Sequence, residues 1–252
     1  MSFFKADNLC INFGGIKAVD GVSFDVEKGR IFTIIGPNGA GKTTIFNLIS
    51  RIYDPSEGTL TFDGQDITRV PPHQIAALGI ARTFQNIELF EHASLLQNLL
   101  LARHAHKKSG FFSELLFLPK VRGMEVEHRE AVEKVIEFLD LQQYRDSLIV
   151  NLPYGVRKVT ELARALCTDP KLLLLDEPSS GLNVEETDDM AFWIQDIKNL
   201  LDITVVMVEH DMKLVSAVSD EVLALNYGRP LAMGAPKDVQ SHPEVVRAYL
   251  GG

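Results

Sequence analysis

Short apolar runs separated by turns open the chain. Residues 8–13, 22–26 and 30–35 are rich in β-branched and aromatic side chains, and turns containing glycine separate them. Residues 58–64 form a similar run between two glycines. Apolar runs bounded by turn residues are typical of β-strands. The sequence therefore predicts four short strands before residue 65.

Further along, apolar residues recur at i, i+3, i+4 and i+7, the spacing of one face of an α-helix. Four such stripes occur: Ile45, Leu48, Ile49 and Ile52; Val132, Val135, Ile136 and Leu139; Val159, Leu162, Ala163 and Leu166; Met190, Trp193, Ile194 and Ile197. We interpret these stripes as core, and residues 86–166 are predicted to be mainly helical. Within that segment, residues 101–130 lack a clean period and are predicted to form a loop with short helices.

Two late runs, residues 172–175 and 204–208, consist almost entirely of apolar side chains. Such runs are typical of strands in a parallel sheet that is covered on both faces. One predicted helix lies between them. Because strands and helices alternate on both sides of the helical segment, the sequence predicts an α/β core interrupted by a helical insert.

Composition narrows the class of protein. The 252 residues are 46% hydrophobic and 23% charged, and the formal net charge of −9 argues against a general nucleic-acid or anionic-lipid surface. The N-terminus shows no signal-peptide pattern, and no apolar run approaches the ~20 residues of a membrane span. Cys10 and Cys167 have no paired motif spacing and are predicted to be buried in a reducing cytosol. Any link to a membrane is expected to go through a partner protein.

A glycine-rich motif follows the third predicted strand and precedes the first helical stripe. Its residues are Gly36, Pro37, Asn38, Gly39, Ala40, Gly41, Lys42 and Thr43. Strand, G-x-x-x-x-G-K-T and helix together are the context of a phosphate-binding loop, in which backbone N–H groups surround phosphate oxygens. Lys42 is expected to reach the β- and γ-phosphates, and the Thr43 hydroxyl is expected to hold Mg²⁺. The sequence therefore predicts binding of a nucleoside triphosphate.

Polar residues at two later strand ends complete the predicted site. Asp176 and Glu177 follow the run 172–175, and His210 follows the run 204–208. Asp176 is the expected Mg²⁺ ligand, Glu177 the base that polarises water, and His210 a donor to the γ-phosphate. Gln85, at the start of the helical segment, is a candidate contact for Mg²⁺ and the water.

In this order the motifs resemble those of the ATP-binding cassette (ABC) ATPases, and the resemblance covers essentially the whole chain. It implies a P-loop NTPase (RecA-like) core of residues 1–87 and 167–252, with an N-terminal antiparallel β subdomain and an α-helical subdomain of residues 88–166. Further residues match motifs of the family: Phe13, which would stack on adenine; Gly36–Thr44, the phosphate loop with Thr44; Gln85; Ser180, Gly181, Leu182 and Asn183, the interface loop; and Leu152, Pro153, Tyr154, Gly155 and Val156, which stand where the family carries Leu-Ser-Gly-Gly-Gln.

Two departures from the family pattern stand out. Pro153, Tyr154 and Val156 replace the serine, first glycine and glutamine of the signature, and Asn183 replaces the usual aspartate of the interface loop. Gly155 remains, so backbone N–H groups at the helix start are still expected to face a phosphate.

Within the family the chain is most similar to the ATPase subunits of branched-chain amino-acid importers, through its Tyr-Gly signature, its long segment 101–130 and its ending at 242–251. The resemblance implies ATP and Mg²⁺ as cofactors and a location on the cytoplasmic face of the inner membrane. The implied partners are a second ABC ATPase subunit, two membrane-spanning permease subunits and an extracytoplasmic solute-binding protein, with no nucleic acid. Three alternatives stay open: a soluble ABC ATPase without a transport role, the ATPase of a lipid or lipopolysaccharide exporter, and a phosphotransferring P-loop kinase.

Overall fold

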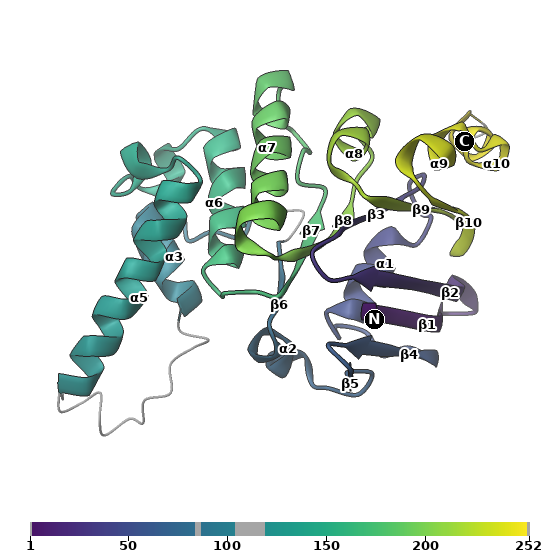
Figure 1. The fold of residues 1–252 in the computed structure, drawn as a ribbon, viewed down its shortest axis with the longest axis horizontal. Coiled ribbons are helices and arrows are strands. Elements are labelled where there is room, and N and C mark those ends of the chain that lie inside the picture. The colour runs from purple at the N-terminus through teal and green to yellow at the C-terminus, as the bar shows by residue number, and fades with distance from the viewer. Residues whose placement is uncertain (1, 84–86, 104–118, 251–252) are drawn as a thin grey trace. The chain divides into compact units, whose positions relative to one another are not determined.

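The computed structural model describes residues 2–83, 87–103 and 119–250. The chain divides into two compact units (Figure 1). The first consists of Met1–Gln85 and Lys171–Gly252, and the second is Asn86–Pro170. The first unit is therefore assembled from both ends of the chain.

A four-stranded antiparallel sheet forms part of the first unit. Its strands are β1 (Ser2–Phe13), β2 (Ile16–Glu27), β4 (Glu57–Phe62) and β5 (Gln65–Asp66), in the order β2-β1-β4-β5. Gly14 and Gly15 join β1 to β2 with φ angles of 52° and 87°, a conformation that favours glycine. Both strands are longer than predicted, because their outer residues alternate between buried and exposed and include many polar side chains.

A six-stranded sheet forms the centre of the same unit. Its strands are β3 (Ile31–Ile35), β6 (Ile80–Arg82), β7 (Leu172–Asp176), β8 (Thr204–Val208), β9 (Glu221–Asn226) and β10 (Arg229–Gly234), in the order β10-β9-β3-β8-β7-β6. Neighbouring strands from β9 to β6 run parallel, whereas β10 is antiparallel to β9. Every residue of β3, β7 and β8 is buried, so the prediction of strands covered on both faces is confirmed.

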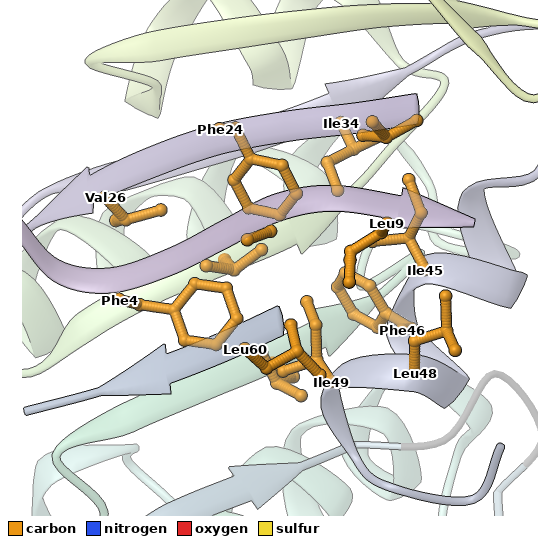
Figure 2. Packing of buried hydrophobic residues seen from close by; sticks show 14 of the residues in the cluster. Phe4, Leu9, Phe24, Val26, Ile34, Ile45, Phe46, Leu48, Ile49 and Leu60 are labelled. Atoms are coloured by element: carbon orange, nitrogen blue, oxygen red, sulfur yellow. The ribbon is translucent and has the colours of Figure 1, made fainter. Parts of the chain in front are cut away.

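Helices cover both faces of this sheet. They are α1 (Lys42–Ile49), α2 (Pro72–Leu78), α7 (Val184–Leu201), α8 (Met212–Val218), α9 (Pro236–Ser241) and α10 (Pro243–Leu250). Figure 2 shows Ile45, Phe46 and Leu48 of α1 packed among side chains of the antiparallel sheet and β3. A smaller cluster on the other side joins β3 and β9 to α8, α9 and α10. Helix α1, and with it the start of its first turn, is thus held by packing against two sheets.

The helical stripe predicted for α1 is wrong at its last member. The helix ends at Ile49, Arg51 has a φ of 60°, and Ile52 is 50% exposed. A left-handed residue ends the helical register, so the residue after it leaves the buried face. The three earlier members, Ile45, Leu48 and Ile49, are fully buried as predicted.

The second unit is helical. It contains α3 (Leu95–Ala102), α5 (Pro119–Phe138), α6 (Tyr154–Leu166) and the 3₁₀ turns η2 (Gln142–Tyr144) and η3 (Ile149–Asn151). The predicted loop with short helices over 101–130 is wrong for 119–130, which belong to the 20-residue helix α5. Half of the residues in that part of α5 are charged and it carries no apolar stripe, so periodicity gave no signal. Residues 104–118 of the predicted loop lie outside the described residues.

The two cysteines differ in their surroundings. Cys167 is buried, and this burial raises the pKa of its thiol to about 12. Cys10 is only partly buried, which corrects the prediction for that residue, and its sulfur accepts a hydrogen bond from the Gly21 N–H at 3.2 Å. Within the described ranges we find no helix with the length and apolar character needed to cross a bilayer.

Candidate active site

The chemistry-bearing residues follow three neighbouring strands. Strand β8 lies between β3 and β7, and all three run parallel. The phosphate loop begins directly after β3, Asp176 and Glu177 stand at the end of β7, and His210 is the second residue after β8. Because parallel strands end at one edge of a sheet, the fold brings the three predicted motifs of this unit together.

The phosphate loop has a backbone that only glycine can supply at two places. Gly36 and Gly41 have φ angles of 153° and 100°. A Cβ atom at Gly36 would lie 2.4 Å from the Leu225 carbonyl oxygen, and one at Gly41 would lie 2.5 Å from that of Ala18. Gly41 is also the N-cap of α1, where no side chain caps the first turn in the described structure. The N–H groups of that turn therefore remain available for an anion.

Lys42 is folded over its own loop. Its side chain is buried, and its ammonium group donates to the carbonyl oxygens of Gly36 at 2.6 Å and Pro37 at 3.1 Å. Burial lowers the pKa of the Lys42 amine, and the nearby carboxylates of Glu177 and Asp176 oppose that shift. The loop thus holds the ammonium group beside the place where phosphate oxygens would sit.

Asp176 is buried and paired with an arginine that sequence reasoning missed. Arg82, the last residue of β6, donates to the Asp176 carboxylate at 2.8 Å, to Asn47 of α1 at 2.7 Å and to Ser50, the C-cap of α1, at 3.0 Å. A hydroxyl at exposed Thr43 and the carboxylate of Asp176 are hard oxygen ligands, which fit Mg²⁺. Gln85, the third expected Mg²⁺ ligand, lies outside the described residues.

Glu177 and His210 face each other. Glu177 has a φ of 49°, and its N–H donates to the Val208 carbonyl at 2.9 Å, which turns the chain sharply after β7. His210 Nδ1 lies 3.9 Å from Glu177 Oε1, and the imidazole remains half-exposed. A left-handed conformation is costly for a residue with a side chain and often marks a functional site. The pair is placed so that one water molecule could contact both side chains.

Phe13 and Tyr53 form an aromatic pair at the surface of the first unit. Their ring centroids are 5.1 Å apart at an interplanar angle of 66°, an edge-to-face arrangement. The Phe13 residue is 43% exposed although it ends β1, a strand of the antiparallel sheet. An exposed ring supported by a second ring is suited to stacking on a base.

Comparison with known proteins identifies the family. The sequence model of the ABC transporter family matches residues 19–180. The high-affinity branched-chain amino acid transport ATP-binding protein BraF of Pseudomonas aeruginosa is 40% identical over 247 residues, 98% of this chain and 97% of that protein. The chain belongs to the ABC transporter family. It binds ATP and is an ATPase, as the members of this family are.

Further ABC proteins are similar to this chain over nearly all of its length. LivG of Escherichia coli, a high-affinity branched-chain amino acid transport ATP-binding protein, is 40% identical over 98% of this chain and 97% of its own. An ATP-binding cassette of an ABC transporter, crystallised in its ADP conformation, is 33% identical, with a TM-score of 0.87 over 100% of both chains. The model of the branched-chain amino acid ATP-binding cassette transporter matches residues 229–252. These matches show that the chain has the fold of the ABC ATPases, with an antiparallel β subdomain and a helical part.

The predicted signature segment, residues 152–156, belongs to the second unit. Leu152 is buried, Pro153 is the N-cap of α6, and Tyr154 is the exposed first residue of that helix. The first turn of α6 lacks a side-chain cap among the residues described. Its backbone N–H groups, which include those of Gly155 and Val156, are therefore the donors that this altered signature retains.

The predicted interface loop, residues 180–183, ends in a helix cap. The Asn183 side chain accepts from the Glu186 N–H at 3.0 Å, and the Glu186 side chain accepts from the Asn183 N–H at 2.9 Å. This reciprocal pair is a capping box at the start of α7. The acceptor that Asn183 keeps in place of the family's aspartate is thus used within the chain. Ser180, Gly181 and Leu182 form the turn before it, and the Gly181 φ is 79°.

Proposed function

We propose that this chain is the ATP-hydrolysing subunit of an importer for branched-chain amino acids or related small polar solutes. The observation that carries the proposal is the match of its C-terminal residues 229–252 to the branched-chain transporter model. Relatives that are 40% identical over nearly the whole chain, and whose names specify branched-chain amino acid transport, support it.

The partners follow from this role. A second ABC ATPase subunit, two permease subunits and, indirectly, an extracytoplasmic solute-binding protein would form the complex. The chain would then lie on the cytoplasmic face of the inner membrane, held there by the permeases. We also propose residues 1–87 and 167–252 as its nucleotide-binding core and residues 88–166 as its helical subdomain.

The proposed mechanism assigns binding to the phosphate loop and α1. Lys42 would exchange the carbonyls of Gly36 and Pro37 for β- and γ-phosphate oxygens, and the Phe13 ring would stack on adenine. Thr43, Gln85 and Asp176 would hold Mg²⁺, which supplies positive charge next to the phosphates. Arg82 keeps the Asp176 carboxylate at the end of β7.

Hydrolysis is assigned to the pair behind the γ-phosphate. Glu177 would accept a proton from the attacking water, and His210 would orient that water and donate to the γ-phosphate. In an ABC dimer each ATP lies between the phosphate loop of one subunit and the signature of the other. Residues 152–156 and the interface loop 180–183 would therefore act on the partner's nucleotide.

Glu177→Gln tests the catalytic assignment. The amide keeps the shape of the side chain but cannot accept the proton, so hydrolysis should fall by ~10²-fold or more. ATP binding should persist, as measured by equilibrium binding of labelled nucleotide. Glu57→Gln, at an exposed position of β4, is the matched control and should hydrolyse ATP normally. Normal turnover in Glu177→Gln would remove this residue from the mechanism.

Purification of the tagged chain from membranes tests the transport role. The proposal expects two permease chains to be recovered with it, and ATPase activity in vesicles to rise when a loaded solute-binding protein is added. Stimulation by leucine-, isoleucine- or valine-loaded binding protein would support the substrate class. Recovery without any membrane protein would favour the soluble alternative and contradict the proposal.

A further inference from the structure

Glu209 is a fully buried carboxylate between two motifs of the site. It follows the last residue of β8 and precedes His210, and its exposed fraction is 0%. Oε1 accepts from the Ser179 N–H at 2.9 Å and from the Ser179 hydroxyl at 2.6 Å. Oε2 accepts from the N–H groups of His210 at 2.7 Å and Asp211 at 3.0 Å. Both oxygens act only as acceptors in these bonds, as in an ionised carboxylate.

The four donors come from segments far apart in sequence. Ser179 lies two residues after Glu177, and its carbonyl accepts from the Leu182 N–H at 3.1 Å within the interface loop. His210 and Asp211 lie directly after β8 and begin the connection to α8. One side chain therefore fixes the backbone of the turn after Glu177 relative to the backbone that carries His210.

We propose that Glu209 is a positioning residue that sets the geometry between Glu177 and His210. The inference rests on the hydrolytic roles proposed above for those two residues. Glu209 is fully buried and contacts main chain, Ser179 and, with Oε2 3.7 Å from His210 Nδ1, the imidazole of His210, so it would act through these neighbours and would not touch the nucleotide. Its carboxylate links the end of β7 to the end of β8, the two places where the water-activating side chains begin.

The alternative is that Glu209 only stabilises the fold. A buried carboxylate that accepts four hydrogen bonds would destabilise the protein if it were lost, whatever its role. The two readings differ in what happens to molecules that remain folded. A positioning residue changes the turnover of each ATP-loaded molecule, whereas a purely structural residue changes only the number of loaded molecules.

Glu209→Gln is the test, with the full chain assayed for hydrolysis and for moles of ATP bound per mole of protein. The amide presents an NH₂ group to one pair of donors, so one of the two segments loses its acceptor. We expect kcat per bound ATP to fall roughly 10- to 100-fold, the range typical of ångström-scale misplacement, and KM for ATP to stay within about twofold. Glu221→Gln is the matched control, because Glu221 is a partly buried carboxylate at the start of β9, the opposite end of the sheet. Its kcat per bound ATP should equal that of the wild type.

A second variant covers the case in which Glu209→Gln does not fold. Ser179→Ala removes the hydroxyl donor and leaves the Ser179 N–H, so kcat per bound ATP should fall in the same way but less. Wild-type kcat per bound ATP in either folded variant would overturn the inference. If Glu177→Gln and His210→Ala also hydrolyse ATP normally, the proposed function fails instead; if those two are impaired and Glu209→Gln is not, only the role of Glu209 fails.

Discussion

The guanidinium group of Arg82 ties the carboxylate at the end of β7 to the first helix after the phosphate loop. It donates to Asp176, Asn47 and Ser50, and both members of its ion pair with Asp176 are almost completely buried. Its carbon Cζ also lies 5.5 Å from the centroid of the Phe46 ring. One residue therefore couples the expected Mg²⁺ ligand to the helix that presents the phosphate loop.

Arg82→Ala should destabilise the protein strongly. Loss of one partner leaves the Asp176 carboxylate buried without its cation, which typically costs ~3–5 kcal/mol. Thermal unfolding of the nucleotide-free chain measures this as a lower midpoint. Arg247→Ala, at an exposed position of α10, is the control and should unfold like the wild type. An unchanged midpoint in Arg82→Ala would mean that water replaces the arginine at little cost.

Phe13→Ala should weaken nucleotide binding without affecting the core. Stacking on a base is worth roughly 1–3 kcal/mol, so the Kd for ATP should rise ~5- to 150-fold. Phe13 is 43% exposed and contacts Tyr53, so little buried volume is lost. GTP should also be accepted, because stacking reads the ring face and not its hydrogen bonds. Phe192→Ala, an exposed aromatic position on α7, is the control; an unchanged Kd in Phe13→Ala would place the stacking platform elsewhere.

At the scale of the elements, the capping box of α7 has a consequence for the interface loop. Asn183→Ala removes the acceptor for the Glu186 N–H, and loss of such a cap typically costs ~1 kcal/mol. Asn183→Asp keeps an acceptor and adds negative charge at the positive end of the helix, so it should be at least as stable as the wild type. Equilibrium unfolding of the three proteins measures this order. A stable Asn183→Ala would show that the loop holds its conformation without the cap.

The elements that could be predicted from sequence are those whose pattern comes from burial. Residues 172–175 and 204–208 lie on strands that are buried on both faces. The stripe on α6 is also buried; its members are Val159, Leu162, Ala163 and Leu166. Both patterns are visible in the sequence because the core requires apolar side chains at these positions. The charged half of α5 carries no such requirement, so its helix was missed.

The residues of the site also fall into those that could be predicted from sequence and those that could not. The phosphate loop, Asp176, Glu177 and His210 could be placed because their spacing from strands is local in sequence. Arg82 and Glu209 could not, because their roles come from partners 94 and 30 residues away, which only the folded chain brings into contact. For Glu209 the one available signal was a charged residue directly after the predicted strand 204–208, which alone does not name a partner; no strand was predicted at Arg82, so that residue carried no signal.

At the scale of the whole molecule, the proposed nucleotide chemistry would use residues from both compact units. Lys42, Glu177 and His210 belong to the first unit, whereas the signature position 152–156 belongs to the second. In the proposed ABC dimer the second unit of one subunit would serve the nucleotide held by the first unit of the other. If the partner ATPase is a different chain, the two composite sites are chemically unequal.

The altered signature leads to a prediction about how the two composite nucleotide sites differ. Pro153 and Val156 offer no hydroxyl and no amide to a γ-phosphate, and each lost hydrogen bond to a charged group is worth ~1.5–3 kcal/mol. A homodimer of this chain must use that signature twice, so the chain alone should hydrolyse ATP slowly. A complex with a different ATPase subunit and the permeases should exceed the sum of the separate rates. At low protein concentration, Pro153→Ser should raise the rate of the chain alone, because serine restores a hydroxyl and is also a favourable N-cap for α6.

The test of whether the altered signature limits hydrolysis compares three rates. They are the rates of this chain alone, of the partner alone and of the full complex, with this chain carrying either Pro153 or Pro153→Ser. Glu57→Gln is again the control for nonspecific effects of substitution. The uncapped first turn of α6 is the physical reason that the opposite result is possible, since its N–H groups and the helix dipole favour an anion without any side chain. A fully active homodimer that gains nothing from the partner or from Pro153→Ser would show that those backbone groups suffice.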